Sequence, residues 1–267
     1  MASGRTRLFL LLGRPVAHSL SPAMQNAAFA ALGLDATYAA LDCAADDLPV
    51  LVAALARAGG GGNATVPYKE ALAAAVARPS ARAARLGSAN TFWGEEGAVA
   101  GESTDVDGVL DALARLDAPA STWLVAGTGG SARAVVGAAA ERGARVAVRS
   151  RSAERAAAFR AWAAGLGVAA ADEDECEVLI NATPQGLGAA DPLPLDPAAF
   201  ARARWGLDLV YRRGGTAWVR ALAGRGVRAA DGRDVLVAQG AAALERWFSK
   251  VRAPREVMRA AVARALA

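Results

Sequence analysis

Short apolar segments alternate with alanine-rich segments of helical character along this chain, and this alternation limits the folds that the chain can form. The first series has strand-like segments at 8–12, 37–41 and 62–66, with helix-like segments at 22–32 and 48–57 between them. The second series has strand-like segments at 122–126, 145–148 and 178–181, with helix-like segments at 132–142 and 153–165. Strands that alternate with helices form βαβ units around a mostly parallel sheet. We therefore predict an α/β protein with two such units.

The remaining segments predict helices without new strands. A polar-start segment at 105–117 connects the two series, and the segments at 235–248 and 254–267 follow the last strand. Because no strands remain for the final two helices to join, we expect these helices to pack on a unit that already exists.

Composition and charge exclude several classes of partner. The chain has 267 residues, 54% of them apolar and 21% charged, which is typical of one or two folded domains. Its net charge of +4 comes from dispersed arginines without aromatic interleaving, so nucleic acid is not expected as a partner. The charge suits small anionic ligands, and a solvated surface explains it equally well. Cys43 and Cys176 lie far apart without metal-ligand spacing, which predicts free thiols, a reducing cytoplasm and no metal site. No apolar run is long enough to predict a membrane span.

Acid/base chemistry is restricted by the scarcity of suitable side chains. The chain has one histidine, His18, and two lysines, Lys69 and Lys250. Lys69 falls in the first turn of a helix predicted after Pro67. A cation there interacts unfavourably with the helix dipole and does not stabilise the helix, so a catalytic role is the better explanation of this lysine. We expect its carboxylate partner in another segment, with the polar runs at 88–91 and 101–105 as candidates. Lys250 lies in a polar C-terminal stretch and is interpreted as incidental.

A glycine-rich loop follows the first strand of the second series. The strand at 122–126 leads into Gly127-Thr128-Gly129-Gly130-Ser131-Ala132 and then into a helix, which is the pattern G-x-G-x-x-A. The first glycine permits a tight turn, the second lets backbone N–H groups approach a pyrophosphate, and Ala132 permits close helix–strand packing. The loop predicts a dinucleotide site.

The end of the next strand distinguishes NADP(H) from NAD(H). An NAD site places an acidic residue about 20 residues after the first glycine to bind the ribose hydroxyls. Here the segment contains Ser150, Arg151 and Ser152, with Arg155 following, and the first carboxylate is Glu154. Guanidinium and hydroxyl groups suit a 2′-phosphate, so we predict NADP(H).

The segment 13–22 follows the first strand and ends in Ser-Pro. Ser21 is predicted as the N-cap of a helix whose first residue is Pro22. A helix N-terminus of this kind binds a carboxylate readily, and Ser19 supplies a hydroxyl that capping does not explain. The segment 59–70 predicts a flexible turn at its glycines, then a short strand, and then the helix that contains Lys69.

These motifs together resemble the shikimate dehydrogenase family over nearly the whole chain. The motifs, in chain order, are G-x-P-V-x-H-S-x-S-P at 13–22, N-x-T-x-P-x-K at 63–69, G-x-x-N-T at 87–91, T-D at 104–105, the glycine loop at 127–132, [NS]-R-[TS] at 150–152, N-A-T at 181–183, D-L-V-Y at 208–211 and D-G…L-x-x-Q at 231–239. So many motifs in one order are highly specific.

The resemblance implies an N-terminal α/β substrate domain with a mostly parallel sheet, an inserted Rossmann-type NADP domain, and an active-site cleft between them. The boundaries it implies are 1–105 with 235–267 for the substrate domain and 106–234 for the NADP domain. It implies reduction of 3-dehydroshikimate to shikimate in the chorismate route to aromatic amino acids, by a cytoplasmic monomer or homodimer. Lys69 and Asp105 would be the catalytic pair, and His18 would brace the carboxylate-binding turn.

The family's binding residues transfer position by position. Those implied for substrate are Ser19, Ser21, Thr65, Lys69, Asn90, Asp105, Tyr211 and Gln239. Those implied for the cofactor are Gly127, Thr128, Gly129, Gly130, Ser131, Ala132, Ser150, Arg151, Ser152, Arg155, Thr183, Leu209 and Gly232.

The chain departs from the family pattern at a few positions. Gln25, Ser103 and Thr128 replace the usual His, Asn and Ala, and Asp234 and Val235 replace the usual Gly and Met. Asp234 places a carboxylate close to the expected nicotinamide end of the cofactor site. Two alternatives therefore remain: a quinate/shikimate dehydrogenase with altered substrate or cofactor preference, and an inactive dinucleotide-binding regulator.

Overall fold

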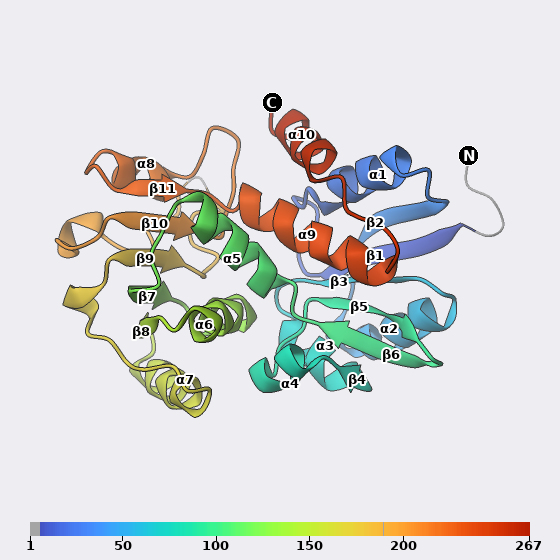
Figure 1. Cartoon of the computed structure of the whole chain (residues 1–267), viewed down its shortest axis with the longest axis horizontal. Coiled ribbons are helices and arrows are strands. Elements are labelled where there is room, and N and C mark those ends of the chain that lie inside the picture. Colours follow the sequence, from blue (N-terminus) through green and yellow to red (C-terminus); the bar gives the residue numbers. More distant parts are fainter. Residues whose placement is uncertain (1–5, 189) are drawn as a thin grey trace. The chain divides into compact units, whose positions relative to one another are not determined.

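The computed structural model describes residues 6–188 and 190–267, and the chain divides into two compact units (Figure 1). Unit 1 comprises Met1–Gly108, Leu236–Ala265 and Ala267, and unit 2 comprises Val109–Val235 and Leu266. Within the described ranges, no helix is both long and apolar enough to cross a membrane.

Unit 1 is built on a six-stranded sheet with the order β2-β1-β3-β5-β6-β4. Its strands are β1 (Arg7–Gly13), β2 (Ala36–Asp42), β3 (Gly61–Ala64), β4 (Arg78–Pro79), β5 (Thr91–Glu95) and β6 (Ala98–Glu102). Its helices are α1 (Ser21–Ala31), α2 (Leu48–Arg57), α3 (Lys69–Ala75), α4 (Ala81–Leu86) and α10 (Arg255–Ala265), with a short 3-10 turn at Ala45–Asp47. Two further helices, α5 (Asp105–Arg115) and α9 (Arg233–Trp247), contain residues of both units.

Alternating side chains of β1 supply the core on both faces of this sheet. Phe9 stacks with Phe29 of α1 and Trp247 of α9, at ring-centroid distances of 5.5 and 4.6 Å. Leu12 points to the opposite face and belongs to an apolar cluster with Val52 of α2 and other residues. This period of two is what a strand buried on both faces requires.

The directions of the central strands bring four chain segments to one edge of the sheet. β1 and β3 are parallel, so the segments that follow them leave at the same edge. β5 is antiparallel to β3, and β6 is antiparallel to β5, with Thr91 opposite Glu102. The start of β5 and the end of β6 therefore lie at the edge where β1 and β3 end.

A tight hairpin joins β5 to β6. The two residues between the strands, Glu96 and Gly97, have φ values of 47° and 78°. Two-residue loops with positive φ at both positions match the twist of antiparallel strands. This hairpin was not predicted from the sequence, because Glu-Gly is a weaker turn signal than Asn-Gly or Asp-Gly.

The glycine run before Asn63 forms a central strand rather than only a flexible turn. The turn is limited to Gly59, with φ 75°, whereas Gly61 and Gly62 belong to β3 and are buried. A Cβ on Gly62 would overlap the carbonyl oxygen of Leu10 in β1. The strand predicted from residue 62 thus begins at Gly61, and close approach of neighbouring backbones leaves no room for side chains there.

Unit 2 is built on a five-stranded parallel sheet with the order β11-β10-β9-β7-β8. Its strands are β7 (Thr122–Ala126), β8 (Arg145–Arg149), β9 (Val178–Asn181), β10 (Trp205–Asp208) and β11 (Arg228–Ala230). Its helices are α6 (Gly130–Arg142), α7 (Ala153–Gly165) and α8 (Ala217–Ala223), with 3-10 turns at Glu173–Glu175 and Pro197–Ala199. All four residues of β9 are buried, as expected for the centre of a parallel sheet.

The predicted α/β class with two mostly parallel sheets is confirmed. Each strand and helix predicted from the two alternating series is present, and most bounds agree within two residues. The final two helices add no strand, and α10 packs against α1 of unit 1. The elements not predicted are the short ones: β4, α4, the β5–β6 hairpin, β10, α8 and β11.

Two glycine substitutions test the close packing of β3. Gly62→Ala forces a Cβ against the backbone of β1, so we expect a loss of about 1–3 kcal/mol in the free energy of unfolding. Gly165→Ala, at the end of α7, meets no atom within 4 Å and should instead stabilise by up to about 1 kcal/mol. Urea unfolding of both variants measures the difference, and equal stability of the two would contradict the packing described.

Candidate active site

A partly buried ion pair lies at the edge of unit 1 where the four segments meet. Lys69 Nζ is 2.6 Å from Asp105 Oδ2, and the two side chains are 12% and 16% exposed. Lys69 is the first residue of α3, and Asp105 is the first residue of α5. The carboxylate therefore lies where the helix dipole favours a negative charge, and it offsets the unfavourable dipole at Lys69.

The side-chain amide of Asn90 connects this pair to α9. Asn90 Nδ2 lies 3.0 Å from Thr104 Oγ1, 3.2 Å from Asp105 Oδ1 and 3.2 Å from Gln239 Oε1, all of them acceptors. Asn90 Oδ1 accepts a hydrogen bond from the backbone N–H of Asp105 at 3.3 Å. The amide thus contacts Asp105 at both its carboxylate and its backbone N–H, and it also contacts Gln239.

A chain of buried hydrogen bonds supports Asn90 from within the sheet. The hydroxyl of Tyr38 donates to Asn63 Oδ1 at 2.8 Å, and Asn63 Nδ2 donates to Thr91 Oγ1 at 2.9 Å. Thr91 Oγ1 is in turn 2.8 Å from Thr104 Oγ1. Burial raises the pKa of Tyr38, so its phenol stays neutral and remains a donor. Such satisfied networks hold side chains rigidly.

The two serines predicted for a substrate carboxylate lie at the start of α1. The helix begins at Ser21, and Leu20 before it already has helical dihedral angles, so Ser21 is not the N-cap that the sequence predicted. Ser19 Oγ accepts the backbone N–H of Ser21 at 3.3 Å. His18 is exposed and forms no hydrogen bond or ion pair with any described residue, so its predicted bracing role is not supported.

Thr65 follows β3 at the same edge as the lysine. Its backbone N–H donates to the carbonyl of Leu12 at 2.8 Å, and its carbonyl accepts from Tyr68 at 2.7 Å. Unit 1 thus contains seven of the eight predicted substrate residues. The eighth, Tyr211, follows β10 in unit 2.

The glycine loop of unit 2 has the geometry expected of an anion site. Gly127 has φ 114°, which favours glycine, and Ala132 is fully buried against the sheet. Gly129 precedes α6 without a side-chain cap, and a Cβ placed on it would meet nothing within 4 Å. The N-terminus of α6 therefore faces open space with backbone donors and no acidic residue in its first turn.

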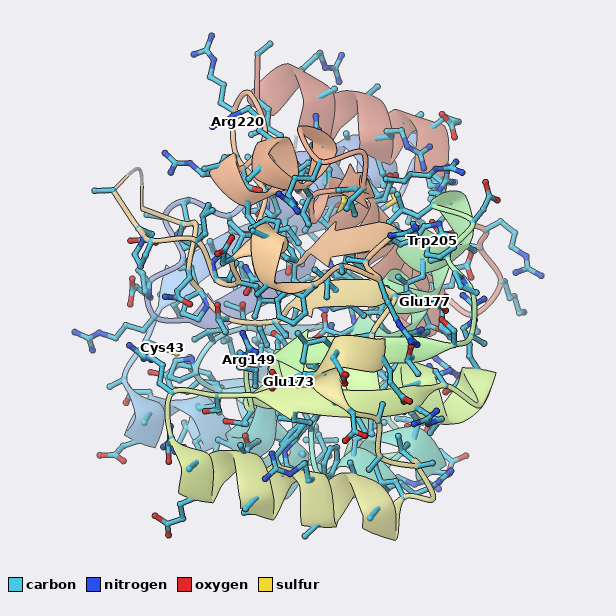
Figure 2. All side chains as sticks on the ribbon, turned by 90° about the vertical axis from the view of Figure 1, so that its left-hand side faces the viewer. Cys43, Arg149, Glu173, Glu177, Trp205 and Arg220 are labelled. Carbon is cyan, nitrogen blue, oxygen red and sulfur yellow. The ribbon has the colours of Figure 1, made fainter. Side chains whose placement is uncertain are left out.

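The segment predicted for the 2′-phosphate forms the start of α7. Ser152 is the N-cap, accepting the backbone N–H of Arg155 at 3.2 Å, while Arg151 and Arg155 are exposed. The neighbouring Arg149 points elsewhere: it pairs with Glu173 (Figure 2). Its guanidinium also lies over the ring of Phe200. Because Arg149 is paired with Glu173, Arg151 and Arg155 are the arginines near the start of α7 that we consider for the 2′-phosphate.

A buried carboxylate joins the end of β9 to the loop between β10 and α8, at the carboxyl edge of the unit 2 sheet. Asp208 Oδ1 accepts from Asn181 Nδ2 at 2.8 Å and from the N–H of Val210 at 3.0 Å, and its Oδ2 accepts from Thr216 Oγ1 at 2.7 Å. Burial raises the pKa of Asp208 to about 6, although these three hydrogen bonds oppose the shift.

Residues predicted for the cofactor are held by the same cluster. Thr183 donates from its hydroxyl to Asn181 Oδ1 at 2.7 Å. Gly232 donates its N–H to Val210 at 3.0 Å, and a Cβ there would overlap the carbonyl oxygen of Leu209. The role of Asp208 was not predicted from the sequence, although an acidic residue at the end of an apolar strand is a signal that could have identified it.

The unexpected Asp234 has a local partner. Its Oδ1 lies 3.8 Å from Nε of Arg115, and it occupies the first turn of α9, where a carboxylate favours the helix. Val235, the other departure at this position, is buried. The extra negative charge is therefore partly neutralised within unit 2.

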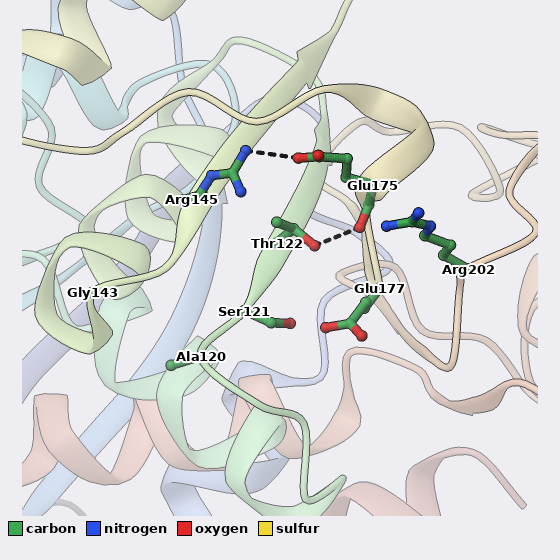
Figure 3. A pocket seen from close by; sticks show the side chains of 8 residues that line it. All are labelled: Ala120, Ser121, Thr122, Gly143, Arg145, Glu175, Glu177 and Arg202. Carbon is green, nitrogen blue, oxygen red and sulfur yellow. Dashed lines mark hydrogen bonds and ion pairs between the residues drawn. The ribbon is translucent and has the colours of Figure 1, made fainter.

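A separate pocket of unit 2 lies at the opposite edge of its sheet. The cavity measures about 380 Å³ and is lined by residues at the starts of the strands, among them Thr122, Arg145 and Glu177 (Figure 3). The glycine loop follows the other end of β7, so this pocket is not the predicted dinucleotide site. No group of three or more His, Cys, Asp or Glu side chains within residues 6–188 and 190–267 is arranged to hold a metal ion.

Known proteins resemble this chain along nearly its full length. The profile of the shikimate dehydrogenase substrate binding domain matches residues 11–92, and that of the shikimate 5'-dehydrogenase C-terminal domain matches residues 232–263. The shikimate dehydrogenases (NADP(+)) of Synechococcus sp. (strain JA-3-3Ab) and Anaeromyxobacter sp. (strain Fw109-5) are 39% and 40% identical. The alignments cover 99% and 98% of this chain and 96% and 98% of those proteins.

A solved structure extends the resemblance to the fold. Shikimate 5-dehydrogenase from Thermus thermophilus, in complex with NADP(H) and shikimate, superposes with a TM-score of 0.88 at 36% identity. The superposition covers 97% of this chain and 99% of that one.

The buried carboxylate predicts a specific pH dependence of stability. An unfolded aspartate titrates near pH 4, so between about pH 4 and 6 the folded protein holds a proton on Asp208 that the unfolded chain has lost. The contribution of Asp208 to the free energy of unfolding therefore falls as the pH rises, by about 3 kcal/mol for a shift of about two units. Above pH 6 the contribution no longer changes.

Asp208→Asn removes the titration while its amide oxygen still accepts from Asn181 and Val210. We expect the stability of this variant, measured by urea unfolding from pH 4 to 7, to lack the fall seen in the parent. Asp174→Asn, at an exposed position, serves as the control and should follow the parent. Parallel curves for Asp208→Asn and the parent would show that the carboxyl does not titrate in this range.

Proposed function

The chain belongs to the shikimate dehydrogenase family, and from this premise we propose that it catalyses the reversible NADPH-dependent reduction of 3-dehydroshikimate to shikimate in the shikimate pathway. The observation that supports this activity most directly is the Lys69–Asp105 ion pair with Asn90 and Gln239 beside it. A site that only binds a dinucleotide has no need of a paired ammonium.

Lys69 is the proton donor in the proposed reduction. NADPH, when bound, supplies the hydride that forms the new C–H bond at the carbonyl carbon. As the C=O π electrons move to oxygen, Lys69 transfers a proton from Nζ to that oxygen, and the product is a neutral alcohol. In the oxidation direction, neutral Lys69 accepts the hydroxyl proton. An arginine cannot replace it, because a guanidinium keeps its proton at any working pH.

Asp105 and the amides define where the reacting oxygen is held. The carboxylate of Asp105 is paired with the ammonium of Lys69 in a partly buried place and, with Asn90 and Gln239, offers polar groups to the ring hydroxyls. Thr65 and, from unit 2, Tyr211 are proposed for other substrate hydroxyls. Ser19 and Ser21, at the start of α1, are proposed for the carboxylate.

The cofactor is assigned to unit 2 on the fit of its glycine loop. Gly129 faces open space that a Cβ would partly fill, and the uncapped N-terminus of α6 offers donors to a pyrophosphate. Ser150–Ser152 and Arg155 are proposed for the 2′-phosphate, and Thr183, Leu209 and Gly232 for the remainder. The substrate and cofactor domains are proposed at 1–105 with 235–267 and at 106–234.

The cellular setting is part of the same proposal. Cys43 and Cys176 are both free and buried, which supports a reducing cytoplasm. A monomer or a homodimer is proposed, and sedimentation of the purified protein distinguishes the two.

One oxidation assay separates the proposed function from its alternatives. The purified protein is given shikimate or quinate with NADP⁺ or NAD⁺, and reduced nicotinamide is measured by absorbance. We expect the highest kcat/KM with shikimate and NADP⁺. Preference for quinate or NAD⁺ would establish the altered paralogue, and absence of any shikimate-dependent reduction would favour the inactive regulator.

Lys69→Ala tests the proton donor. We expect kcat to fall by about 10²–10⁴-fold with a smaller change in KM, because a general acid acts in the transition state. Lys250→Ala is the matched control, since Lys250 is the only other lysine and is exposed. A rise in KM alone would make Lys69 a binding residue.

Arg151→Ala tests the assignment of the 2′-phosphate. Loss of a charge-assisted contact should raise KM for NADP⁺ by about tenfold and leave KM for NAD⁺ unchanged. Arg160→Ala removes an exposed arginine of the same helix region and should alter neither value. Equal effects on the two cofactors would contradict a role specific to the phosphate.

A further inference from the structure

Glu102, the last residue of β6, is a buried carboxylate that the proposed mechanism does not use. Only 4% of its side chain is exposed. Oε1 accepts from Ser80 Oγ at 2.7 Å and from the backbone N–H of Ser103 at 2.8 Å, and Oε2 accepts from Arg246 at 3.1 Å. A buried carboxylate needs hydrogen-bond donors. Because these three come from three different segments of unit 1, Glu102 connects those segments to one another.

Two of the three donors lead along the chain to proposed substrate residues. Ser103 lies two residues before Asp105, in the turn that starts α5. Ser80 caps α4, its hydroxyl also accepting the N–H of Ala83 at 3.0 Å, and α4 leads through Gly87 to Asn90. The backbone N–H of Asn90 in turn donates to the carbonyl of Glu102 at 3.0 Å.

The third donor, Arg246, connects Glu102 to α9. Arg246 and Gln239 are seven residues apart, which places them on the same face of the helix, two turns or roughly 10 Å from each other. The bond from Arg246 to the end of β6 is therefore one of the contacts that fix how far along its axis α9 lies. That position decides whether Gln239 Oε1 reaches Asn90 Nδ2, where the distance is 3.2 Å.

We propose that Glu102 and Arg246 form a positioning pair that aligns Asn90, Asp105 and Gln239 for the ring hydroxyls of the substrate. The inference rests on the proposed function and adds residues to it. Glu102 acts through its neighbours, as its carboxylate oxygens are occupied by Ser80, Ser103 and Arg246. Its effect is therefore on the geometry of substrate binding.

Other anchors keep α9 in place when this pair is broken. Trp247 Nε1 donates to the carbonyl of Phe92 at 3.2 Å, and Gln25 Nε2 donates to the carbonyl of Gly240 at 2.9 Å. Loss of the pair should therefore shift Gln239 locally rather than detach the helix. Small displacements of positioning groups have large kinetic effects.

Four variants and one control test the pair, the fourth variant being Arg246→Lys, which retains the positive charge. Glu102→Gln retains the shape and one acceptor oxygen, Arg246→Met retains the length of the side chain, and the double variant combines them. Glu96→Gln is the control, because it breaks the exposed ion pair with Arg78, in which Glu96 is 76% exposed. For each protein, kcat, KM for shikimate, KM for NADP⁺ and the melting temperature are measured.

We expect both single variants to raise KM for shikimate by about tenfold, with KM for NADP⁺ within about twofold of the parent. The double variant should be no worse than the more affected single variant, because both changes remove the same interaction. Arg246→Lys should partly restore KM, and Glu96→Gln should match the parent.

The activity of the parent protein distinguishes failure of the positioning role from failure of the proposed function. If the parent oxidises shikimate and Arg246→Met leaves KM for shikimate unchanged, the positioning role is wrong even if the melting temperature falls. A purely structural role would lower the active fraction and hence kcat, with both KM values unchanged. If the parent neither binds nor oxidises shikimate, the proposed function itself fails, and this inference fails with it.

Discussion

The ion pair between Lys69 and Asp105 depends on four chain segments that meet at one edge of the unit 1 sheet. β1 and β3 run parallel and end there, whereas β5 starts there and β6 returns to it because the β5–β6 hairpin reverses the chain. Without that reversal, Asn90 and Asp105 would lie at opposite ends of the sheet. An ammonium that is only 12% exposed needs its carboxylate nearby, so the antiparallel hairpin is a requirement of the proposed chemistry.

Each unit contains a buried carboxylate that is stabilised by hydrogen bonds from more than one chain segment. Glu102 in unit 1 and Asp208 in unit 2 each lie at the end of a strand and each accept three hydrogen bonds. Arg246 balances the charge of Glu102, whereas the three donors to Asp208 are neutral and burial raises its pKa to about 6. The stability contribution of Asp208 therefore depends on pH. The carboxylate of Glu102 instead connects β6 to α9 through Arg246.

The parts of the site that were predicted from sequence are those whose chemistry is local. Gly127 and Ala132 were identified because a tight turn and a close helix–strand contact demand small residues at that spacing. Lys69 was identified because an arginine-rich chain retains few lysines and because its helix position is unfavourable. Ser21 was assigned wrongly as a cap, since the dihedral angles of Leu20, which no residue pattern reports, move the helix start by one residue.

The sequence by itself determined the α/β class, the glycine loop, and the residue types available for proton transfer, because each depends on periodicity or on neighbours a few positions away. Only the tertiary structure decided which residues act together. Asn90 and Gln239 are 149 positions apart, and Glu102 and Arg246 are 144 apart, yet each pair is hydrogen-bonded. Such contacts follow from strand direction and from how far α9 lies along its axis. Those two properties arise from the packing of the whole unit, and no local pattern records them.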